Sequence, residues 1–262
     1  MKKVFFMLAA IAMIFASCSK EDNPTPKPLS EQIIGKWMTT EIIGGILPTN
    51  EKYVINFATP TKVYVSTSRS DYTEQQKRWT DHQEFNYSID GNTISFAKEI
   101  SSGTSLVTIE VVIKSITDKE LACVVKRHIR REGQEPTVLE YSAIYNRVTK
   151  DYSKDVLGLW EGHCTSAGSV FDDGQEHRWQ YKADGTYVYY VKDGDDWVPS
   201  ENTLNEYFVD GTLLCSRWID QGQENREWWE INIDGDKMNW TALRQKEDGS
   251  TFTATFEMKK VE

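Results

Sequence analysis

Two stretches of this chain repeat the same unusual pattern. Ile33-Ile34-Gly35-Lys36-Trp37 recurs as Val156-Leu157-Gly158-Leu159-Trp160, and the sequence contains no other Gly-x-Trp. Further matches follow in the same order, with Tyr87-Ser88-Ile89-Asp90-Gly91 corresponding to Tyr207-Phe208-Val209-Asp210-Gly211. A fold that satisfies one copy must satisfy the other, so the chain is expected to be a tandem duplication of a unit of roughly a hundred residues.

Both copies have the sequence pattern of β-strands. Each consists of short runs rich in Val, Ile, Thr, Tyr, Phe and Trp, with apolar residues at alternate positions and Asp-Gly or Gly-Asn turns between the runs. This pattern predicts antiparallel strands with one buried face. About eight strands fit in each copy, and closure of such a sheet into an up-and-down barrel removes its exposed edges. We therefore expect an all-β protein with two tandem antiparallel barrels, at 30–148 and 155–262.

The Gly-x-Trp that opens the first strand of each predicted barrel resembles the signature of the lipocalin family, especially its lipocalin-like lipoprotein domains. The resemblance implies structural roles for Gly35, Trp37, Gly158 and Trp160. In that family the tryptophan plugs one end of the barrel, and the other end opens to a ligand. The glycine allows close packing against the strand, and the indole N–H needs a hydrogen-bond partner. The later motifs of the family, including a closing arginine, are not identified in the sequence.

Residues 1–17 have the composition of a cleaved export signal. Lys2 and Lys3 precede the apolar run Val4–Ala16, which is shorter than the roughly 20 apolar residues of a transmembrane helix. The small residues before Cys18 resemble the cleavage site of a bacterial lipoprotein. The resemblance implies a mature chain that begins at Cys18 and is held in the membrane by several acyl chains, palmitate among them.

Residues 18–29 connect this anchor to the folded body. Ser19-Lys20-Glu21-Asp22 resembles the export tag of Bacteroidota-type lipoproteins on the outer face of the outer membrane, although a solvated charged linker has the same composition. Pro24, Pro26 and Pro28 favour extended polyproline geometry of about 3.1 Å per residue. A stalk at the cell surface is therefore expected.

The acidic excess lies entirely in the second copy. Residues 18–150 carry 17 acidic and 17 basic side chains, whereas residues 151–262 carry 23 acidic and 11 basic ones. A negative surface of this kind argues against nucleic acid as a partner of the second half.

The two predicted interiors differ in chemistry. Inward positions of the first barrel are mostly aliphatic, as in a filled core, whereas those of the second are aromatic with polar tips. A barrel of about eight strands is just wide enough to be filled by side chains or to hold one small ligand. The rings are therefore either core or the lining of a site for a hydrophobic or aromatic molecule or a glycan fragment. The candidate lining residues are Trp179, Tyr181, Tyr187, Tyr189, Trp229 and Trp240.

Catalytic and metal-binding patterns are not found. The four histidines have none of the spacings of a zinc site, and the acidic cluster 193–196 surrounds a glycine, as expected of a hairpin turn. We expect no enzyme activity, no metal and no cofactor. Beyond Cys18, Cys164 and Cys215 could form a disulfide that leaves Cys123 reduced, or all three could be small buried thiols.

Two surface features have open interpretations. The basic cluster Lys126–Arg131 could bind an anionic ligand or a lipid headgroup, dock against the acidic second barrel, or keep a hairpin in water. Trp79 and Trp197 could stack on a sugar ring or fold back onto the sheet.

The sequence thus predicts a lipid-anchored, non-enzymatic envelope protein that captures a small molecule in a barrel. The alternative is a structural or protein-interaction lipoprotein with filled barrels and no small-molecule ligand.

Overall fold

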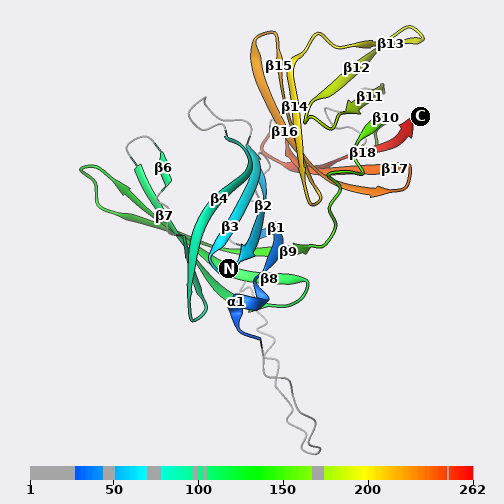
Figure 1. Cartoon of the computed structure of the whole chain (residues 1–262). Helices are drawn as coiled ribbons and strands as arrows, with labels where there is room; N and C mark the ends of the chain where they lie inside the picture. Colours follow the sequence, from blue (N-terminus) through cyan, green and yellow to red (C-terminus); the bar gives the residue numbers. More distant parts are fainter. Residues whose placement is uncertain are drawn as a thin grey trace, which may run out of the picture.

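The computed structural model describes residues 27–43, 51–69, 78–96, 100–102, 105–166, 174–246 and 248–261. Within them the chain is almost entirely strand, arranged as two antiparallel sheets of nine strands that follow one another along the sequence (Figure 1). The expected all-β class with two tandem barrels is confirmed. The predicted signal peptide, Cys18 and most of the Pro-rich tether lie outside the described residues.

The first sheet closes into a ring. Its strands are β1 (Gly35–Ile43), β2 (Glu51–Thr59), β3 (Lys62–Arg69), β4 (Arg78–Asp90), β5 (Thr93–Phe96), β6 (Ile100–Ser102), β7 (Ser105–Ile116), β8 (Glu120–Arg131) and β9 (Thr137–Val148). They lie in the order β5-β4-β3-β2-β1-β9-β8-β7-β6, and β5 also pairs with β7. This additional pairing makes an eight-stranded barrel and leaves β6 outside it.

The second sheet curls in the same way but meets itself at one bridge. Its strands are β10 (Gly158–Cys164), β11 (Glu176–Tyr181), β12 (Tyr187–Asp193), β13 (Asp196–Pro199), β14 (Thr203–Asp210), β15 (Leu213–Asp220), β16 (Gln223–Asp234), β17 (Lys237–Gln245) and β18 (Thr251–Val261). They lie in the order β13-β12-β11-β10-β18-β17-β16-β15-β14. Thr186, beside β12, bridges to Glu206 of β14, and the Tyr207 N–H donates to the Gly185 carbonyl at 2.8 Å.

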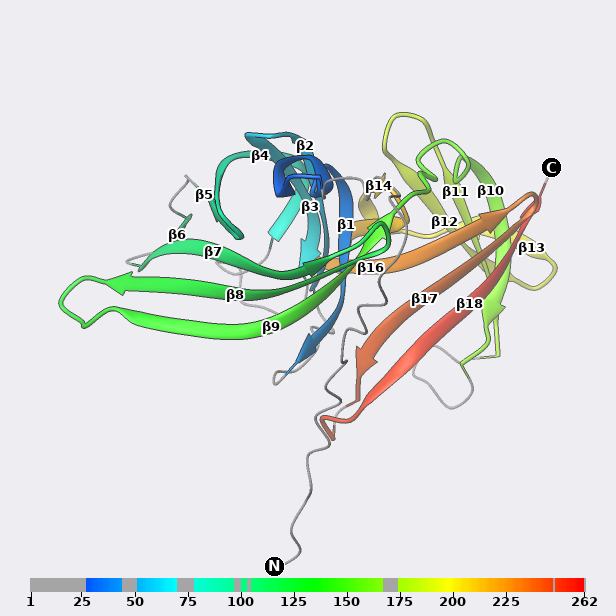
Figure 2. The same ribbon diagram turned by 90° about the horizontal axis from the view of Figure 1, so that it is seen from below.

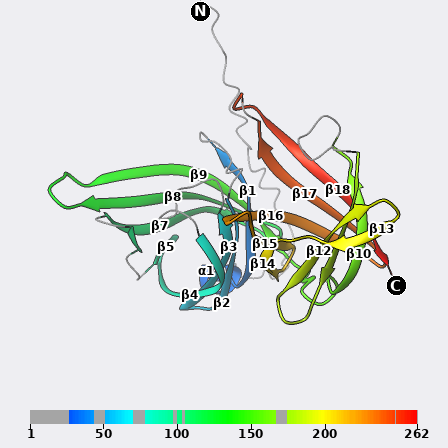
Figure 3. The ribbon, with the colours of Figure 1, turned by 90° about the horizontal axis from the view of Figure 1, so that it is seen from above.

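Strands β7, β8 and β9 of the first barrel are 12 residues long and continue beyond the ring as an arm. The arm points away from the second barrel (Figures 2 and 3). The basic cluster Lys126–Arg131 lies on β8 in this arm. Lys126 Nζ is 3.6 Å from Glu140 Oε2, and His128 Nε2 is 3.3 Å from Glu110 Oε2. These two side chains therefore meet acids of the arm itself and not the acidic second barrel.

The two Gly-x-Trp motifs adopt the same geometry. Trp37 Nε1 donates to the Ile33 carbonyl at 2.7 Å, and Trp160 Nε1 donates to the Val156 carbonyl at 2.7 Å. Both indoles are fully buried. The N–H that the sequence leaves in need of a partner thus finds one four residues upstream in each copy, and each indole seals its end of a barrel.

A cation covers each of these indoles. The Arg147 guanidinium carbon lies 4.1 Å from the centre of the Trp37 ring, and Lys260 Nζ lies 5.1 Å from that of Trp160. A Cβ on Gly35 would come within 2.7 Å of Arg147, and one on Gly158 within 2.8 Å of Lys260. Both glycines also have positive φ, at 120° and 116°. Each position therefore requires glycine for two reasons: the backbone has a positive φ, and a side chain would displace the cation that covers the indole.

Arg147 helps to close this end of the first barrel, a role that the sequence did not reveal. It donates to the carbonyls of Ile34 and Gln32 at 2.6 and 2.7 Å while it covers Trp37. The latter carbonyl belongs to α1 (Leu29–Gln32), a single turn that starts directly after Pro28. Pro28 itself is extended, with φ −60° and ψ 152°, as a polyproline tether requires. Of the predicted tether, Leu29 is already part of this helix at the sealed end of the first barrel.

The two matched Tyr-x-x-Asp-Gly segments also repeat one contact. The Tyr87 hydroxyl donates to the Thr59 carbonyl at 2.7 Å, and the Tyr207 hydroxyl donates to the Lys182 carbonyl at 2.7 Å. Each tyrosine thus ties its strand to an earlier turn of its own copy, the β2–β3 turn in the first and the β11–β12 turn in the second. The copies share a fold at the level of single hydrogen bonds.

The barrels pack against each other through their outer faces. Met38 and Val54 point out of the first barrel, because the alternate residues Trp37 and Ile55 point in, yet both are buried against the core of the second. From the other side, the Phe208 ring meets Trp79 edge-on, with 4.9 Å between ring centres. Burial of large apolar side chains on both sides makes this contact a continuous core and not a loose interface.

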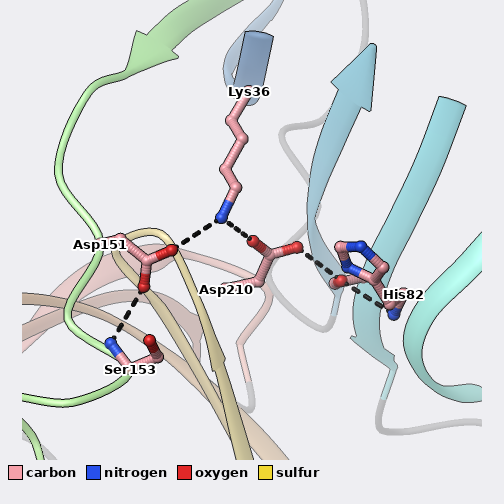
Figure 4. Close-up of polar contacts among 6 residues, drawn as sticks. Lys36, His82, Asp151, Ser153 and Asp210 are labelled. Carbon is pink, nitrogen blue, oxygen red and sulfur yellow. Dashed lines mark hydrogen bonds and ion pairs between the residues drawn. The ribbon is translucent and has the colours of Figure 1, made fainter. Parts of the chain in front are cut away.

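A polar cluster at the rim of this contact holds three segments together (Figure 4). Lys36 Nζ of the first barrel lies 2.7 Å from Asp210 Oδ1 of the second and 2.9 Å from Asp151 Oδ2 of the connector. Ser66 Oγ donates to the other Asp210 oxygen at 2.6 Å. The buried Asp210 carboxylate is thus matched by a cation and a hydroxyl, both from the other barrel.

The same cluster depends on pH. Burial raises the pKa of Asp151, but hydrogen bonds from Lys36 and Ser153 outweigh it and hold the pKa below the ordinary 3.8. A carboxyl whose pKa is lowered by folding stabilises the folded state above its ordinary pKa. The contribution of Asp151 is therefore present at neutral pH and is lost as the pH falls through its lowered pKa.

Replacing Asp210 tests whether this cluster joins the barrels. Asp210→Ala leaves Lys36 with Asp151 as its acidic partner and removes the acceptor of the Ser66 hydroxyl. The substitution is expected to lower the free energy of unfolding by about 2 kcal/mol. Urea titration followed by tryptophan fluorescence measures it. Asp236→Ala, at an exposed turn of the same barrel, is the control. Equal stability of both variants would contradict the proposed coupling.

Candidate ligand-binding site

Four of the six predicted lining residues form one aromatic cluster inside the second barrel. Trp179 lies opposite Tyr189 across β11 and β12, with 5.1 Å between ring centres. It also lies 4.9 Å from Trp240, which is 5.4 Å from Trp229. Phe256 of β18 packs among them, 5.7 Å from Trp240. Strands far apart in the sequence therefore contribute to a single stack of rings.

The other two predicted residues lie deeper, near the sealed end. Tyr181 lies opposite Tyr187, with 6.0 Å between ring centres, and packs edge-on against Tyr207 at 4.8 Å. Desolvation raises the pKa of Tyr181 well above its ordinary value and that of Tyr207 to about 12. Both of these predicted residues, like Tyr207, are buried core residues.

On several strands the exposure of the inner face increases in one direction. Tyr181 is buried, but Trp179 and His177 before it on β11 are half-buried. The same change occurs from Tyr187 to Tyr189 on β12. The end of the barrel toward which exposure rises is called the open end. Half-buried inner residues at the open end are His177, Trp179, Tyr189, Trp218, Glu227, Arg244 and Phe252.

Glu227 is a carboxylate on this inner face. It lies opposite Ser216, whose Oγ donates to Glu227 Oε1 at 3.4 Å, and it precedes Trp229 by two positions on β16. Burial raises its pKa, against the opposing effects of the Arg244 charge and of hydrogen bonds from Trp229 and Ser216. The aromatic lumen therefore contains a carboxylate that its surroundings do not fully compensate.

Arg244 and Trp240 complete the polar groups of the lumen. The Arg244 guanidinium lies 4.5 Å from the centre of the Trp229 ring and donates to the Trp228 carbonyl at 2.6 Å. Trp240 is 2% exposed, and its Nε1 has no hydrogen-bond partner among the described residues. A buried N–H without a partner costs about 1–3 kcal/mol, so an acceptor that reached Trp240 would be bound favourably.

Tyr189, a member of the aromatic cluster, contacts a histidine. His177 Nδ1 lies 2.8 Å from the Tyr189 hydroxyl, and the two rings stack 6.1 Å apart. Trp179 stacks on His177 as well, at 5.5 Å. His177 therefore fixes the position of the half-buried rings at the open end.

The first barrel has the same division into a sealed and a partly exposed half. Near Trp37 the inner residues are buried, whereas the opposite half is lined by half-buried side chains, mostly without polar groups. These are Tyr53, Ile55, Phe85, Ile109, Val111 and Tyr141. The interior has the apolar character predicted for it, and none of these six side chains carries a charge, in contrast to Glu227 and Arg244 in the second barrel.

A separate hollow of about 570 Å³ lies outside the sealed end of the first barrel. It is lined by Lys27, Glu31, Gln32, Ile34, Thr117, Asp118 and Arg147. Arg147 already binds two carbonyls and covers Trp37, so this hollow is part of the structural closure of the barrel.

The predicted disulfide does not form. Cys164 and Cys215 are buried thiols, as is Cys123, and none is in a disulfide. β10 and β15 are separated by β18, β17 and β16 in the sheet, so the two cysteines are not neighbours. Cys164 lies on the inner face with Phe256, whereas Cys215 lies on the outer face in the contact between barrels. The alternative of small buried thiols is the correct one.

The two tryptophans with open interpretations are both packed. Trp79 lies in β4 and contacts Phe208 of the second barrel, with the Arg217 guanidinium 5.0 Å from its ring centre. Trp197 lies in β13, with the Arg178 guanidinium at 4.4 Å. Neither presents a bare ring to a sugar. Among the residues described, no three His, Cys, Asp or Glu side chains are grouped as metal ligands would be.

Comparison with known proteins identifies no family. No family model and no curated protein matches the chain. One similar solved structure is the crystal structure of a protein of unknown function from the DUF3598 family of Nostoc punctiforme. It is 11% identical, the match covers 88% of this chain and 97% of that one, and the TM-score is 0.26. A TM-score this low supports no inference about function.

No membrane-crossing helix occurs in the part of the chain that the structure describes, since none is long and apolar enough.

Glu227 and Arg244 were missed at the sequence level, although a signal was present. Glu227 has the same parity on β16 as Trp229, Ile231 and Ile233, which are all buried inward positions. Alternation therefore placed this acid in the lumen from the start. A charged residue is ordinarily assigned to the surface, and that default conceals an interior carboxylate.

Replacing Glu227 by glutamine tests its burial. A carboxyl whose pKa is raised by folding destabilises the folded state increasingly as the pH rises above its ordinary value of 4.5. Glu227→Gln is therefore expected to raise the free energy of unfolding at pH 7 by about 1 kcal/mol, and to change it little at pH 4. Glu257→Gln, on the exposed outer face of β18, is the control for thermal melts at both pH values. Destabilisation at pH 7 would show that Glu227 is fully compensated.

Proposed function

We propose that this chain is a lipid-anchored, non-enzymatic envelope protein whose second barrel captures a small aromatic molecule or glycan fragment. One observation carries the proposal: the half-buried Trp179 and Tyr189 at the open end adjoin Trp240, whose buried N–H has no partner among the described residues. The flat rings provide a surface on which an aromatic or sugar ring can stack, and the unpaired Trp240 N–H can orient the ligand through one hydrogen bond.

The different roles proposed for the two barrels are supported by their contacts. The first barrel meets the tether at its sealed end and uses its outer face to hold the second. The second keeps its lumen free of that contact, since Phe208 and Cys215 of the interface lie on its outer face. The first barrel is therefore the scaffold in this proposal, and the second is the binder.

The location rests on the sequence. A signal that ends at Cys18, an acidic tag and a proline-rich tether together favour a lipoprotein on the outer face of the outer membrane. A ligand site at the open end of a raised barrel is suited to capture from the medium. The non-catalytic character rests on the sequence, where the histidines have none of the spacings of a zinc site and the acidic cluster 193–196 lies at a turn.

A second candidate function is protein interaction through the arm of the first barrel. Val138 and Leu139 on β9 are 52% and 48% exposed, on opposite faces of the arm. Exposed apolar side chains on a protruding hairpin are typical of contact surfaces. In this role the arm would bind an envelope protein, and the lumen of the second barrel would be filled only by its own side chains.

Trp179→Leu tests the capture of a ligand. The substitution removes the half-buried indole that stacks on Tyr189 and Trp240, and we expect at least a tenfold loss of affinity for any aromatic compound that binds the wild type. Binding is measured by calorimetry with a panel of aromatic compounds, bile acids, lipids and glycans. Trp197→Leu, which removes an indole from β13 of the same barrel, should bind as the wild type does. Equal affinity of both variants, or a panel without a binder, would overturn the proposal.

Treatment of intact cells with proteinase tests the location. Digestion of the folded body without lysis is expected, because the tether holds both barrels outside the membrane. A periplasmic protein of the same cells, which should survive, is the control. Protection of the barrels until the cells are lysed would place them on the periplasmic side.

A further inference from the structure

The open end of the second barrel carries a group of acids without ion pairs among the described residues. Asp193, Asp195 and Asp196 surround the turn between β12 and β13, Glu201 precedes β14, and Asp220 ends β15. All five are exposed. Cations near this end have other partners, as in the pairs of Lys192 with Glu176 and Arg226 with Glu224. The rim of the lumen is therefore negative.

The sealed end of the same barrel is different. In its turns, acids and lysines are neighbours. The charge of Lys182 helps to lower the pKa of Asp184, and Lys237 pairs with Asp234 across the β16–β17 hairpin. Lys260 covers Trp160 at this end. The acidic character of the rim is thus more than the general acidity of this half of the chain. A negative rim raises the local concentration of cations at the mouth of the lumen.

The lumen behind this rim also favours a cation. Glu227 is a carboxylate held in an aromatic environment, and Arg244 compensates it only in part. Trp229 lies on the same face of β16 as Glu227, its ring adjoins that of Trp240, and Trp240 in turn adjoins Trp179. Electron-rich ring faces attract an organic cation more strongly where water is excluded. A ligand that carried its own positive charge would supply the missing compensation for Glu227.

Trp240 defines a second feature of such a ligand. Its buried Nε1–H lacks an acceptor among the described residues, and its ring adjoins that of Trp229, which lies two positions from Glu227 on the same face of β16. The carboxylate and the unmet donor are thus neighbours of the same indole. One small molecule can meet both if it has a positive group and an acceptor at opposite ends of a flat ring.

We infer that the ligand of the second barrel is an aromatic amine, with an ammonium group that meets Glu227, a ring that stacks on Trp179 and Tyr189, and an oxygen that accepts from Trp240. This inference rests on the proposed capture function and specifies the class of molecule that is captured. It makes Glu227 the residue that determines specificity for charge.

Three compounds of matched shape test the inference by calorimetry on the full chain. Tyramine has a phenolic oxygen and an ammonium group, tyrosol replaces the ammonium by a hydroxyl, and 3-(4-hydroxyphenyl)propionate replaces it by a carboxylate. Tyramine is expected to bind at least tenfold more tightly than tyrosol, with the propionate weakest. Tyramine affinity should also fall as salt is added, because the rim charges are exposed.

Two variants assign the effect to Glu227. Glu227→Gln should reduce tyramine affinity at least tenfold and leave tyrosol unchanged, and circular dichroism with thermal melts confirms that this variant is folded. Glu257→Gln removes the same charge from the outer face of β18 and should change neither affinity. Binding of tyrosol or the propionate as tightly as tyramine, or an unchanged tyramine affinity in Glu227→Gln, would overturn the amine assignment while capture stands. If neither these compounds nor the wider panel bound, capture itself would fall.

Discussion

Each barrel of this protein depends on a cation that covers the tryptophan of its Gly-x-Trp motif. Arg147 covers Trp37, and Lys260 covers Trp160, in the space that Gly35 and Gly158 leave free. These contacts join the first strand of each barrel to its last. They close one end of each barrel. The location of any ligand site is therefore determined by the end of the barrel that is closed.

Duplication gave the two copies the same closure but different uses of their remaining surfaces. The first copy buries its outer face against the second, with Met38 and Val54 as part of the second core and Lys36 bound to Asp210. The second copy keeps an aromatic lumen that contains Glu227. Two barrels packed through a shared core, one of them with such a lumen, are a suitable arrangement for the proposed binding module on a membrane tether.

Much of this architecture could be predicted from sequence because it is local or periodic. The repeated motif located both barrels, and alternation placed Trp179, Trp229 and Trp240 on the inner face. The features that could not be predicted depend on pairing between distant segments. Arg147 is over a hundred residues from Trp37 in the sequence, and Phe208 meets Trp79 only because the barrels pack together. The disulfide prediction was wrong because sequence does not reveal which strands are neighbours.

The central proposal is that the second barrel binds a small aromatic molecule at its open end. Native mass spectrometry of the protein purified from its own host tests it most directly. We predict a retained small molecule that is released on unfolding, contains a basic nitrogen, and is absent from a Trp179→Leu preparation. A mass that equals the mature lipidated chain alone, together with tryptophan fluorescence that no compound of the panel changes, would contradict it.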